Sequence, residues 1–183
     1  DASPGAGLVH QLRKHTSGVK SIAFDSCAES GRLLASVSDD STLCLWDTSS
    51  GELRTHFTME PSPSTQGGVA VYGNFAVTGG SDGFVRVWNL QRRFLAYELG
   101  KHEGPVTCIS FLPGSDGSTV VTSSEDGIVR VWDVPEQREK QSVTCPSAVT
   151  SMAMFSDGKA VATGHDTGSI AVWDLASGER RLR

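Results

Sequence analysis

Four short stretches of the chain share one pattern and decide its fold: Leu43-Cys44-Leu45-Trp46-Asp47, Val85-Arg86-Val87-Trp88-Asn89, Val129-Arg130-Val131-Trp132-Asp133 and Ile170-Ala171-Val172-Trp173-Asp174. They contain all four tryptophans, and successive tryptophans are 42, 44 and 41 residues apart. The two-residue alternation within each stretch is that of a β-strand with one buried face. The even spacing predicts four copies of one structural unit.

The sequence around each tryptophan repeats as well. A turn precedes each of these strands, at 39–41, 81–83, 125–127 and 166–168, and a glycine in three of the turns permits the positive φ of a tight hairpin. Two further strands are expected before each turn: 34–37, 76–79, 120–123 and 161–164, and before those 19–24, 68–72, 106–111 and 149–155. A fourth is expected after each tryptophan, at 52–57, 94–99, 139–144 and as a stub at 179–182.

A unit of about 42 residues with four antiparallel strands and a Trp-Asp ending resembles the WD40 repeat, one blade of a β-propeller. The resemblance implies an all-β fold of four four-stranded antiparallel blades. It covers residues 8–183 as repeats of about 8–50, 51–92, 93–137 and 138–183, after a polar N-terminal tail at 1–7.

The resemblance also implies a hydrogen-bonded chain inside each blade that joins a His, a strand Ser or Thr, the turn Asp and the Trp indole. Repeats one and three match it fully, repeat two lacks the His, and repeat four lacks both the His and the Asp, having Thr167 there. The matching residues are His15, Ser36, Asp40 and Trp46; Thr78, Asp82 and Trp88; His102, Thr122, Asp126 and Trp132; and Thr163 and Trp173.

A linked His, Ser and Asp also suggests a catalytic triad, but we interpret the set as a structural brace. It recurs in two repeats, and the indole occupies the hydroxyl that would act as the nucleophile. The sequence contains no phosphate-binding glycine loop and no metal-ligand spacing. We therefore expect no enzymatic activity and no cofactor.

WD40 propellers usually have seven blades, and this chain has four repeats. Leu8 to Leu12 is expected to be the outer (fourth) strand of a preceding repeat. The chain would then have five outer strands but only four sets of the three inner strands. We therefore expect a part of a larger propeller, of seven blades or more, whose end blades expose apolar faces. The remaining blades are expected in the same full-length protein; a closed four-bladed ring is the alternative.

Composition and charge limit the kinds of partner that this chain is expected to bind. The net charge of -5 makes direct nucleic-acid binding unfavourable, and no apolar run is long enough for membrane insertion. The four cysteines (Cys27, Cys44, Cys108 and Cys145) form no paired motif, which favours an intracellular setting, cytoplasmic or nuclear. The basic pairs Arg92-Arg93 and Arg180-Arg181 are expected to be solvated edges.

The resemblance implies that partner proteins dock on the top face of the propeller. Carried onto this sequence, the protein-binding positions are Gly18, Lys20, Asp39, Ala70, Ser81, Pro105, Thr107, Glu125, Thr150 and Asp166. None of them is Trp, Tyr, Phe or Arg, the usual hot-spot residues, and three are acidic turn residues. This face is expected to bind weakly and to prefer basic segments; simple solvated turns are the alternative.

The most concrete function is thus a non-catalytic protein-protein interaction scaffold within a multi-subunit complex. The alternative is an accessory propeller of a larger multidomain enzyme or RNA-associated complex whose active domain lies outside this chain. The Pro/Ser-rich segment 59–67 is expected to be an ordinary loop, with Ser62 or Ser64 as alternative phosphorylation sites, and His165 is expected to lie on the surface.

Overall fold

The computed structural model describes residues 10–27, 32–59 and 66–181 of the 183-residue chain. The described part contains strands and turns only, so it has no helix with the length and apolar character needed to cross a membrane. The predicted all-β fold is confirmed. Ser62 and Ser64 lie outside the described residues.

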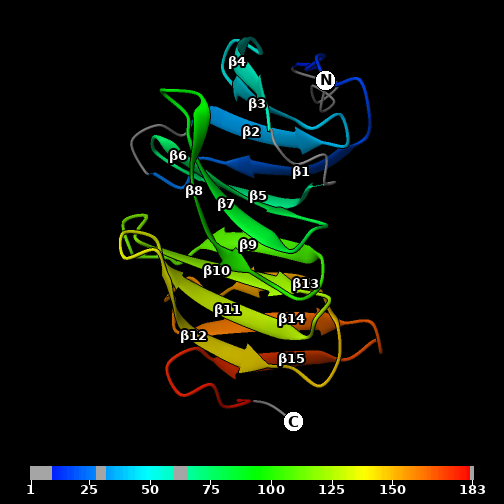
Figure 1. Ribbon diagram of the computed structural model, residues 1–183, viewed down its shortest axis with the longest axis vertical. Helices are drawn as coiled ribbons and strands as arrows, with labels where there is room; N and C mark the ends of the chain where they lie inside the picture. The colour runs from blue at the N-terminus through cyan, green and yellow to red at the C-terminus, as the bar shows by residue number, and fades with distance from the viewer. Residues whose placement is uncertain (1–9, 28–31, 60–65, 182–183) are drawn as a thin grey trace, which may run out of the picture.

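The strands form four separate antiparallel sheets, each built from consecutive strands in chain order. We call these sheets blades one to four (Figure 1). Blade one contains β1 (Val19–Phe24), β2 (Leu33–Ser38), β3 (Thr42–Asp47) and β4 (Leu53–Thr58). Blade two contains β5 (Gln66–Tyr72), β6 (Phe75–Gly80), β7 (Phe84–Asn89) and β8 (Phe94–Lys101). Blade three contains β9 (Val106–Phe111), β10 (Thr119–Ser124), β11 (Ile128–Asp133) and β12 (Arg138–Thr144). Blade four contains β13 (Val149–Met154), β14 (Ala160–His165) and β15 (Ile170–Asp174).

The two outer strands predicted at the chain ends differ from the others. In blade four, the stub predicted at 179–182 is represented by Arg180, which pairs with Trp173 in a single antiparallel bridge. The strand predicted at 8–12 lies partly outside the described residues, and its described part, residues 10–12, forms no strand. An outer strand needs the third strand of its own blade as a partner, and no such blade precedes blade one in the structure.

Successive blades stack face to face, with blade one at the top and blade four at the bottom of Figure 1. The first strand of each blade lies against the preceding blade: β5 contacts β1 and β2, β9 contacts β5 and β6, and β13 contacts β9 and β10. Each of the three interfaces contains its own hydrophobic cluster. The stack is open, because no sheet joins blade four to blade one.

The alternation within each third strand produces this stacking. In β3, Leu43 and Leu45 point toward blade two and share a cluster with Trp88, which points back from blade two. At the next interface, Trp132 of blade three packs against Val85 and Val87 of blade two. At the last interface, Trp173 of blade four packs against Val129 and Val131 of blade three. Because side chains alternate across a strand, one strand supplies apolar groups to both neighbouring interfaces.

The turns define two rims, one at each end of the strands, and the names top rim and bottom rim do not refer to the orientation of Figure 1. The top rim consists of the turns that join the second and third strands of each blade, together with the starts of the first strands. The bottom rim consists of the first-to-second and third-to-fourth strand turns. Antiparallel order places the two rims at opposite ends of the strands.

Candidate functional site

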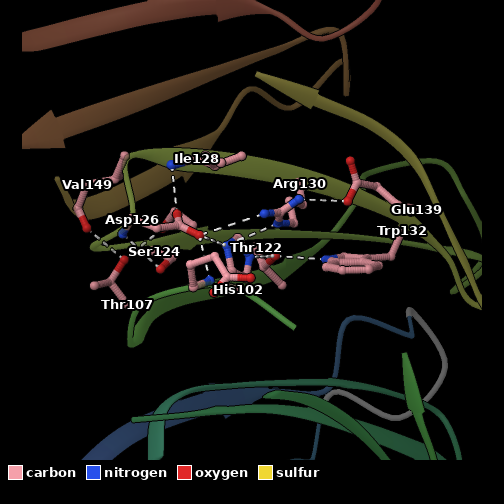
Figure 2. Close-up of polar contacts among 12 residues, drawn as sticks. His102, Thr107, Thr122, Ser124, Asp126, Ile128, Arg130, Trp132, Glu139 and Val149 are labelled. Atoms are coloured by element: carbon pink, nitrogen blue, oxygen red, sulfur yellow. Dashed lines mark hydrogen bonds and ion pairs between the residues drawn. The ribbon is translucent and has the colours of Figure 1, made fainter. Parts of the chain in front are cut away.

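The hydrogen-bonded chain expected inside the blades is present in blades one and three. In blade one, the Trp46 indole Nε1 lies 2.8 Å from Ser36 Oγ, which lies 2.7 Å from His15 Nε2. The other ring nitrogen of His15 lies 3.1 Å from Asp40 Oδ2. In blade three, Trp132, Thr122, His102 and Asp126 repeat these contacts (Figure 2) at 2.8, 2.7 and 3.0 Å.

The partners fix the direction of the hydrogen bonds in blade three. The Trp132 indole can only donate, so Thr122 accepts from it with its hydroxyl oxygen. The Asp126 carboxylate can only accept, so His102 donates to it from Nδ1 at 3.0 Å; the protonated Nδ1 then accepts no hydrogen bond from Arg130 Nε, which lies 3.3 Å away. The neutral imidazole then accepts from the Thr122 hydroxyl at Nε2, and every group of the chain is satisfied.

The surroundings favour this protonation state. Burial lowers the pKa of His102, whose side chain is fully buried, and the nearby Asp126 carboxylate opposes this only in part. Burial alone would raise the pKa of Asp126. Backbone N–H groups of Ile128 and Glu103, together with the His102 ring, outweigh burial and lower it. Blade three therefore has a neutral imidazole beside an ionised carboxylate.

Blade two lacks the histidine, and an arginine takes over its contact with the turn aspartate. The Arg86 guanidinium is buried and lies 2.7 Å from Asp82 Oδ2 and 3.1 Å from Glu98 Oε1. The indole of Trp88 still donates to Thr78 Oγ1, at 2.8 Å. Arg86 alternates with the apolar residues of β7, a pattern that predicts a side chain on the opposite face of the strand from Val85 and Val87.

Blade four uses a histidine from a different part of the sequence. His165, expected on the surface, is only 5% exposed, which corrects that expectation. Its Nε2 lies 3.0 Å from Thr163 Oγ1, which also accepts from the Trp173 indole at 2.8 Å, and its Nδ1 faces the Ser147 carbonyl at 3.3 Å. A backbone carbonyl therefore replaces the missing aspartate as the acceptor. Alternation along β14 places His165 on the same side of the blade as Thr163.

These internal chains have no free nucleophile. Each of the four hydroxyls already accepts an indole N–H, and all four are buried. Among the described residues there is no group of three His, Cys, Asp or Glu side chains that could hold a metal ion. Burial also raises the pKa of the Cys145 thiol to about 11, so it is a weak nucleophile at neutral pH.

The top rim carries a hollow to which all four blades contribute. Its volume is about 290 Å³, and its lining includes six of the ten positions named from the sequence: Lys20, Ser81, Pro105, Thr107, Glu125 and Thr150. Lys20, Thr107 and Thr150 share a structural reason for being there. Each is the extra residue of a β-bulge near the start of its first strand, where the pairing register shifts by one. A bulge redirects the side chain of the extra residue away from the sheet faces.

The register corrects one position in blade two. Ala70, named as the equivalent of Lys20, lies 6% exposed in the cluster between blades two and three. The bulge of β5 falls between Gln66 and Gly68, so the equivalent residue is Gly67, which does line the hollow. A Cβ on Gly67 would lie 1.8 Å from the Val106 carbonyl oxygen, so the approach of blade three requires glycine there.

The remaining named positions lie around the hollow. Asp39 pairs with Lys20 at 3.0 Å, and its backbone N–H donates to the Gly18 carbonyl. Glu125 and Asp166 are exposed turn residues, and no lysine or arginine of the described residues pairs with either. Among the described residues that line the hollow, the one cation, Lys20, is thus already neutralised by Asp39, while Glu125 keeps its charge available.

Several curated proteins are similar to parts of this chain. The pre-mRNA-splicing factor cwf17 of Schizosaccharomyces pombe is 33% identical over 53% of this chain and 28% of its own length. The periodic tryptophan protein 2 homolog of Dictyostelium discoideum is 26% identical over 79% and 15%, and the human angio-associated migratory cell protein is 34% identical over 48% and 20%. The chain thus spans less than a third of the length of these relatives.

A family model supports the repeat structure directly. The model described as WD domain, G-beta repeat matches residues 6–47, 65–89, 94–133 and 138–174. Each match ends on the residue that follows one of the four tryptophans. These matches cover most of the chain, and their order agrees with blades one to four. The protein belongs to the WD40-repeat family.

Proposed function

We propose that this protein is a non-catalytic scaffold that docks basic segments of partner proteins on its top rim within a multi-subunit complex. The observation that carries the proposal is the top-rim hollow, where all four blades contribute residues and Glu125 is unpaired. A rigid framework with turns that converge on one hollow suits the holding of a partner better than chemistry, because the described residues that line the hollow include no His or Cys.

The charge of the rim determines the kind of partner. Asp39, Glu125 and Asp166 occupy the same turn position in three blades, and Lys20 neutralises only the first of them. A lysine- or arginine-rich segment would find two uncompensated carboxylates. Because these groups are exposed, the attraction is modest and is screened by salt.

Binding of short peptides tests this proposal. A fluorescent Lys/Arg-rich peptide should bind the wild-type protein more tightly than a Glu-rich peptide of equal length, and raising the salt from about 50 to about 500 mM should weaken binding severalfold. The double variant Glu125→Gln/Asp166→Asn should reduce the affinity for the basic peptide. Glu136→Gln, which removes one carboxylate from the bottom rim, should not. Indifference to peptide charge and to salt would refute the proposal.

We also infer that further blades of the same full-length protein cover the two end faces. On blade one, Ile22 and Phe24 are each 62% exposed, whereas their equivalents in blade two, Val69 and Val71, are 4% and 0% exposed. On blade four, Ile170 is 74% exposed, and its equivalents Leu43, Val85 and Val129 are all 0% exposed. At the interfaces within this chain, a neighbouring blade buries the residue at each of these equivalent positions.

The relatives favour a place in an intracellular assembly. The name of cwf17 identifies it as a pre-mRNA-splicing factor, which supports a complex in the nucleus or cytoplasm for this chain too. Direct nucleic-acid binding has less support, because the net charge is -5 and the top rim is acidic. Purification of the tagged full-length protein at low and high salt, followed by identification of the bound proteins and RNA, tests both points.

A further inference from the structure

The bottom rim carries a cleft between blades two and three that the repeat architecture does not require. It has a volume of about 500 Å³ and lies against the first-to-second strand turns of both blades and the third-to-fourth strand turn of blade three. We call it the aromatic cleft and define it by Tyr72, Phe75, Tyr97, Phe111, Asp116, Val134 and Pro135. It contains both tyrosines of the chain.

Equivalent positions at the next interface show that these aromatic residues are not part of the repeat. The strand registers make Leu112, Thr119 and Gln141 of blade three the counterparts of Tyr72, Phe75 and Tyr97. These three line a cleft of about 420 Å³ between blades three and four, at the same place on the bottom rim. The described residues that line that cleft include no aromatic residue but do include Lys140, Lys159 and Arg181.

The first interface gives the same result. There the counterparts of Tyr72, Phe75 and Tyr97 are Asp25, Leu33 and Thr55. Three blade interfaces therefore pack well, yet only the one between blades two and three has aromatic side chains at these positions. Tyr72 and Tyr97 do pack against the cluster between blades two and three, but the other two interfaces show that such packing does not require aromatic side chains at these positions.

Contacts position three of the aromatic side chains, and the fourth, Phe75, is accessible. The Tyr72 and Phe111 rings lie 5.6 Å apart, and the Tyr97 hydroxyl donates to the Val134 carbonyl at 2.9 Å. Phe75 is 41% exposed, although its counterpart Thr119 is 5% exposed. Aromatic side chains are enriched among the residues that carry binding energy at protein interfaces.

The charge of the cleft indicates which kind of residue should lie next to an apolar side chain of a partner that enters it. Asp116 is exposed, and it is the one charged residue among the described residues that line the cleft. A carboxylate at the edge of an apolar cleft favours a cation next to the buried group. A cleft of this volume accommodates a few side chains, which suits a short extended segment.

We propose that the aromatic cleft is a second docking site, which takes an extended segment of a partner protein with a large apolar residue next to a lysine or arginine. The site goes beyond the proposed top-rim function, because it lies at the opposite end of the strands. It also lies between two complete four-stranded blades, so it does not depend on what covers the end faces.

Selection from a library of random twelve-residue peptides displayed on phage tests the site. The immobilised target is the protein, and counter-selection uses the double variant Phe75→Thr/Tyr97→Gln. These substitutions introduce the residues that blade three has at the same positions, so the variant should unfold within a few degrees of the wild type. We expect enriched peptides to have Leu, Phe or Trp within two positions of Lys or Arg and to bind the double variant at least tenfold more weakly.

Two matched variants complete the test. Asp116→Asn should reduce the affinity of these peptides severalfold, whereas Lys159→Ser, in the equivalent cleft of blades three and four, should leave it unchanged. Enriched peptides that bind the wild type and the double variant equally would overturn the proposal. Self-association of the wild type that the double variant abolishes would also overturn it, because a second copy would then be the occupant. Salt-sensitive binding that is lost in Glu125→Gln/Asp166→Asn but not in the cleft variant would support the top rim alone.

Discussion

The hydroxyl of Thr122 joins two groups that would otherwise be stranded inside blade three. It accepts from the Trp132 indole and donates to His102, and Thr122 and His102 are fully buried. A buried donor or acceptor that loses its partner costs more free energy than the hydrogen bond itself contributes. At the residue scale, the stability of each blade therefore depends on one small hydroxyl.

The variant Thr122→Val measures this dependence, since it keeps the shape of the side chain and removes the hydroxyl. We expect it to lower the free energy of unfolding by about 1–3 kcal/mol, because the indole N–H and the His102 Nε2 both lose their partner. Thr144→Val, at an exposed position of the same blade, should change it by less than about 0.5 kcal/mol. Urea unfolding followed by tryptophan fluorescence gives both values, and equal effects would contradict the internal role.

His102 also predicts a pH dependence. Its pKa in the folded protein lies below the ordinary value of 6.5, so the unfolded chain binds a proton more readily than the folded chain. Stability should therefore fall as the pH is lowered through about 6.5 and below. Denaturant unfolding at about pH 7.5 and pH 5.5 measures the fall.

In His102→Gln the fall between these two pH values should be smaller, although the variant is less stable overall. The lowered pKa of Asp126 has its effect at more acidic pH, because its ordinary value is 3.8, and so does not interfere. An unchanged pH dependence in His102→Gln would show that other groups are responsible.

At the element scale, the polar side chain that accompanies the indole and the hydroxyl comes from three different positions in the four blades. Blades one and three use a histidine before the first strand, blade four uses His165 at the end of its second strand, and blade two uses Arg86 in its third. What the blades share is the indole and the hydroxyl, at 2.8 Å in each case. The third group varies: a histidine contacts the hydroxyl in blades one, three and four, whereas Arg86 of blade two contacts the turn carboxylate of Asp82.

Arg86→Met tests the arrangement in blade two. Asp82 and Glu98 are partly exposed and keep some hydration, so we expect a loss of about 1–3 kcal/mol, less than for a fully buried pair. Arg54→Met breaks the surface pair with Asp47 and should cost less than about 1 kcal/mol. Thermal unfolding of both variants checks the order, and a larger effect at Arg54 would contradict it.

At the scale of the whole molecule, the stack has two apolar ends. Ile22, Phe24 and Ile170 are each more than 60% exposed, at positions where the internal interfaces exclude water. Exposed apolar faces of this kind promote association. The 183-residue chain by itself should therefore self-associate at its ends.

A triple variant, Ile22→Thr/Phe24→Thr/Ile170→Thr, should reduce self-association of the 183-residue chain in sedimentation velocity, with little change in its unfolding temperature. Val85→Thr, at the buried counterpart of Ile170, should instead destabilise the chain by about 1–3 kcal/mol, because it buries a hydroxyl without a partner. If the wild-type chain remained monomeric at all concentrations, the end faces would not promote self-association and the prediction would be wrong.

Much of the fold could be predicted because its signals are local and repeated. The alternation around Trp46, Trp88, Trp132 and Trp173 specifies strand faces, and four-fold repetition turns a weak pattern into a firm one. The same repetition located the hydroxyl of each blade. It failed in blade two, where the His is missing and counting from the leading valine of the first strand misplaced the bulge by three residues and named Ala70 in place of Gly67.

Other features had no sequence signal of their own. His165 and Arg86 are ordinary strand residues until the blade folds around them, and the top-rim hollow needs turns from four blades to converge. The aromatic cleft joins Tyr72, Tyr97 and Pro135, which are far apart in the chain. Their proximity depends on how blade two sits on blade three.

The sequence by itself determined the repeat, the strand order within each blade and the side chains that face each interface, because a two-residue alternation and a near-constant spacing are properties of neighbouring residues. Only the tertiary structure decided which groups complete each internal hydrogen-bonded chain, where the bulges fall and which rims carry a hollow or a cleft. Those features arise where separate blades meet, and the distance between two blades is set by the side chains packed between them.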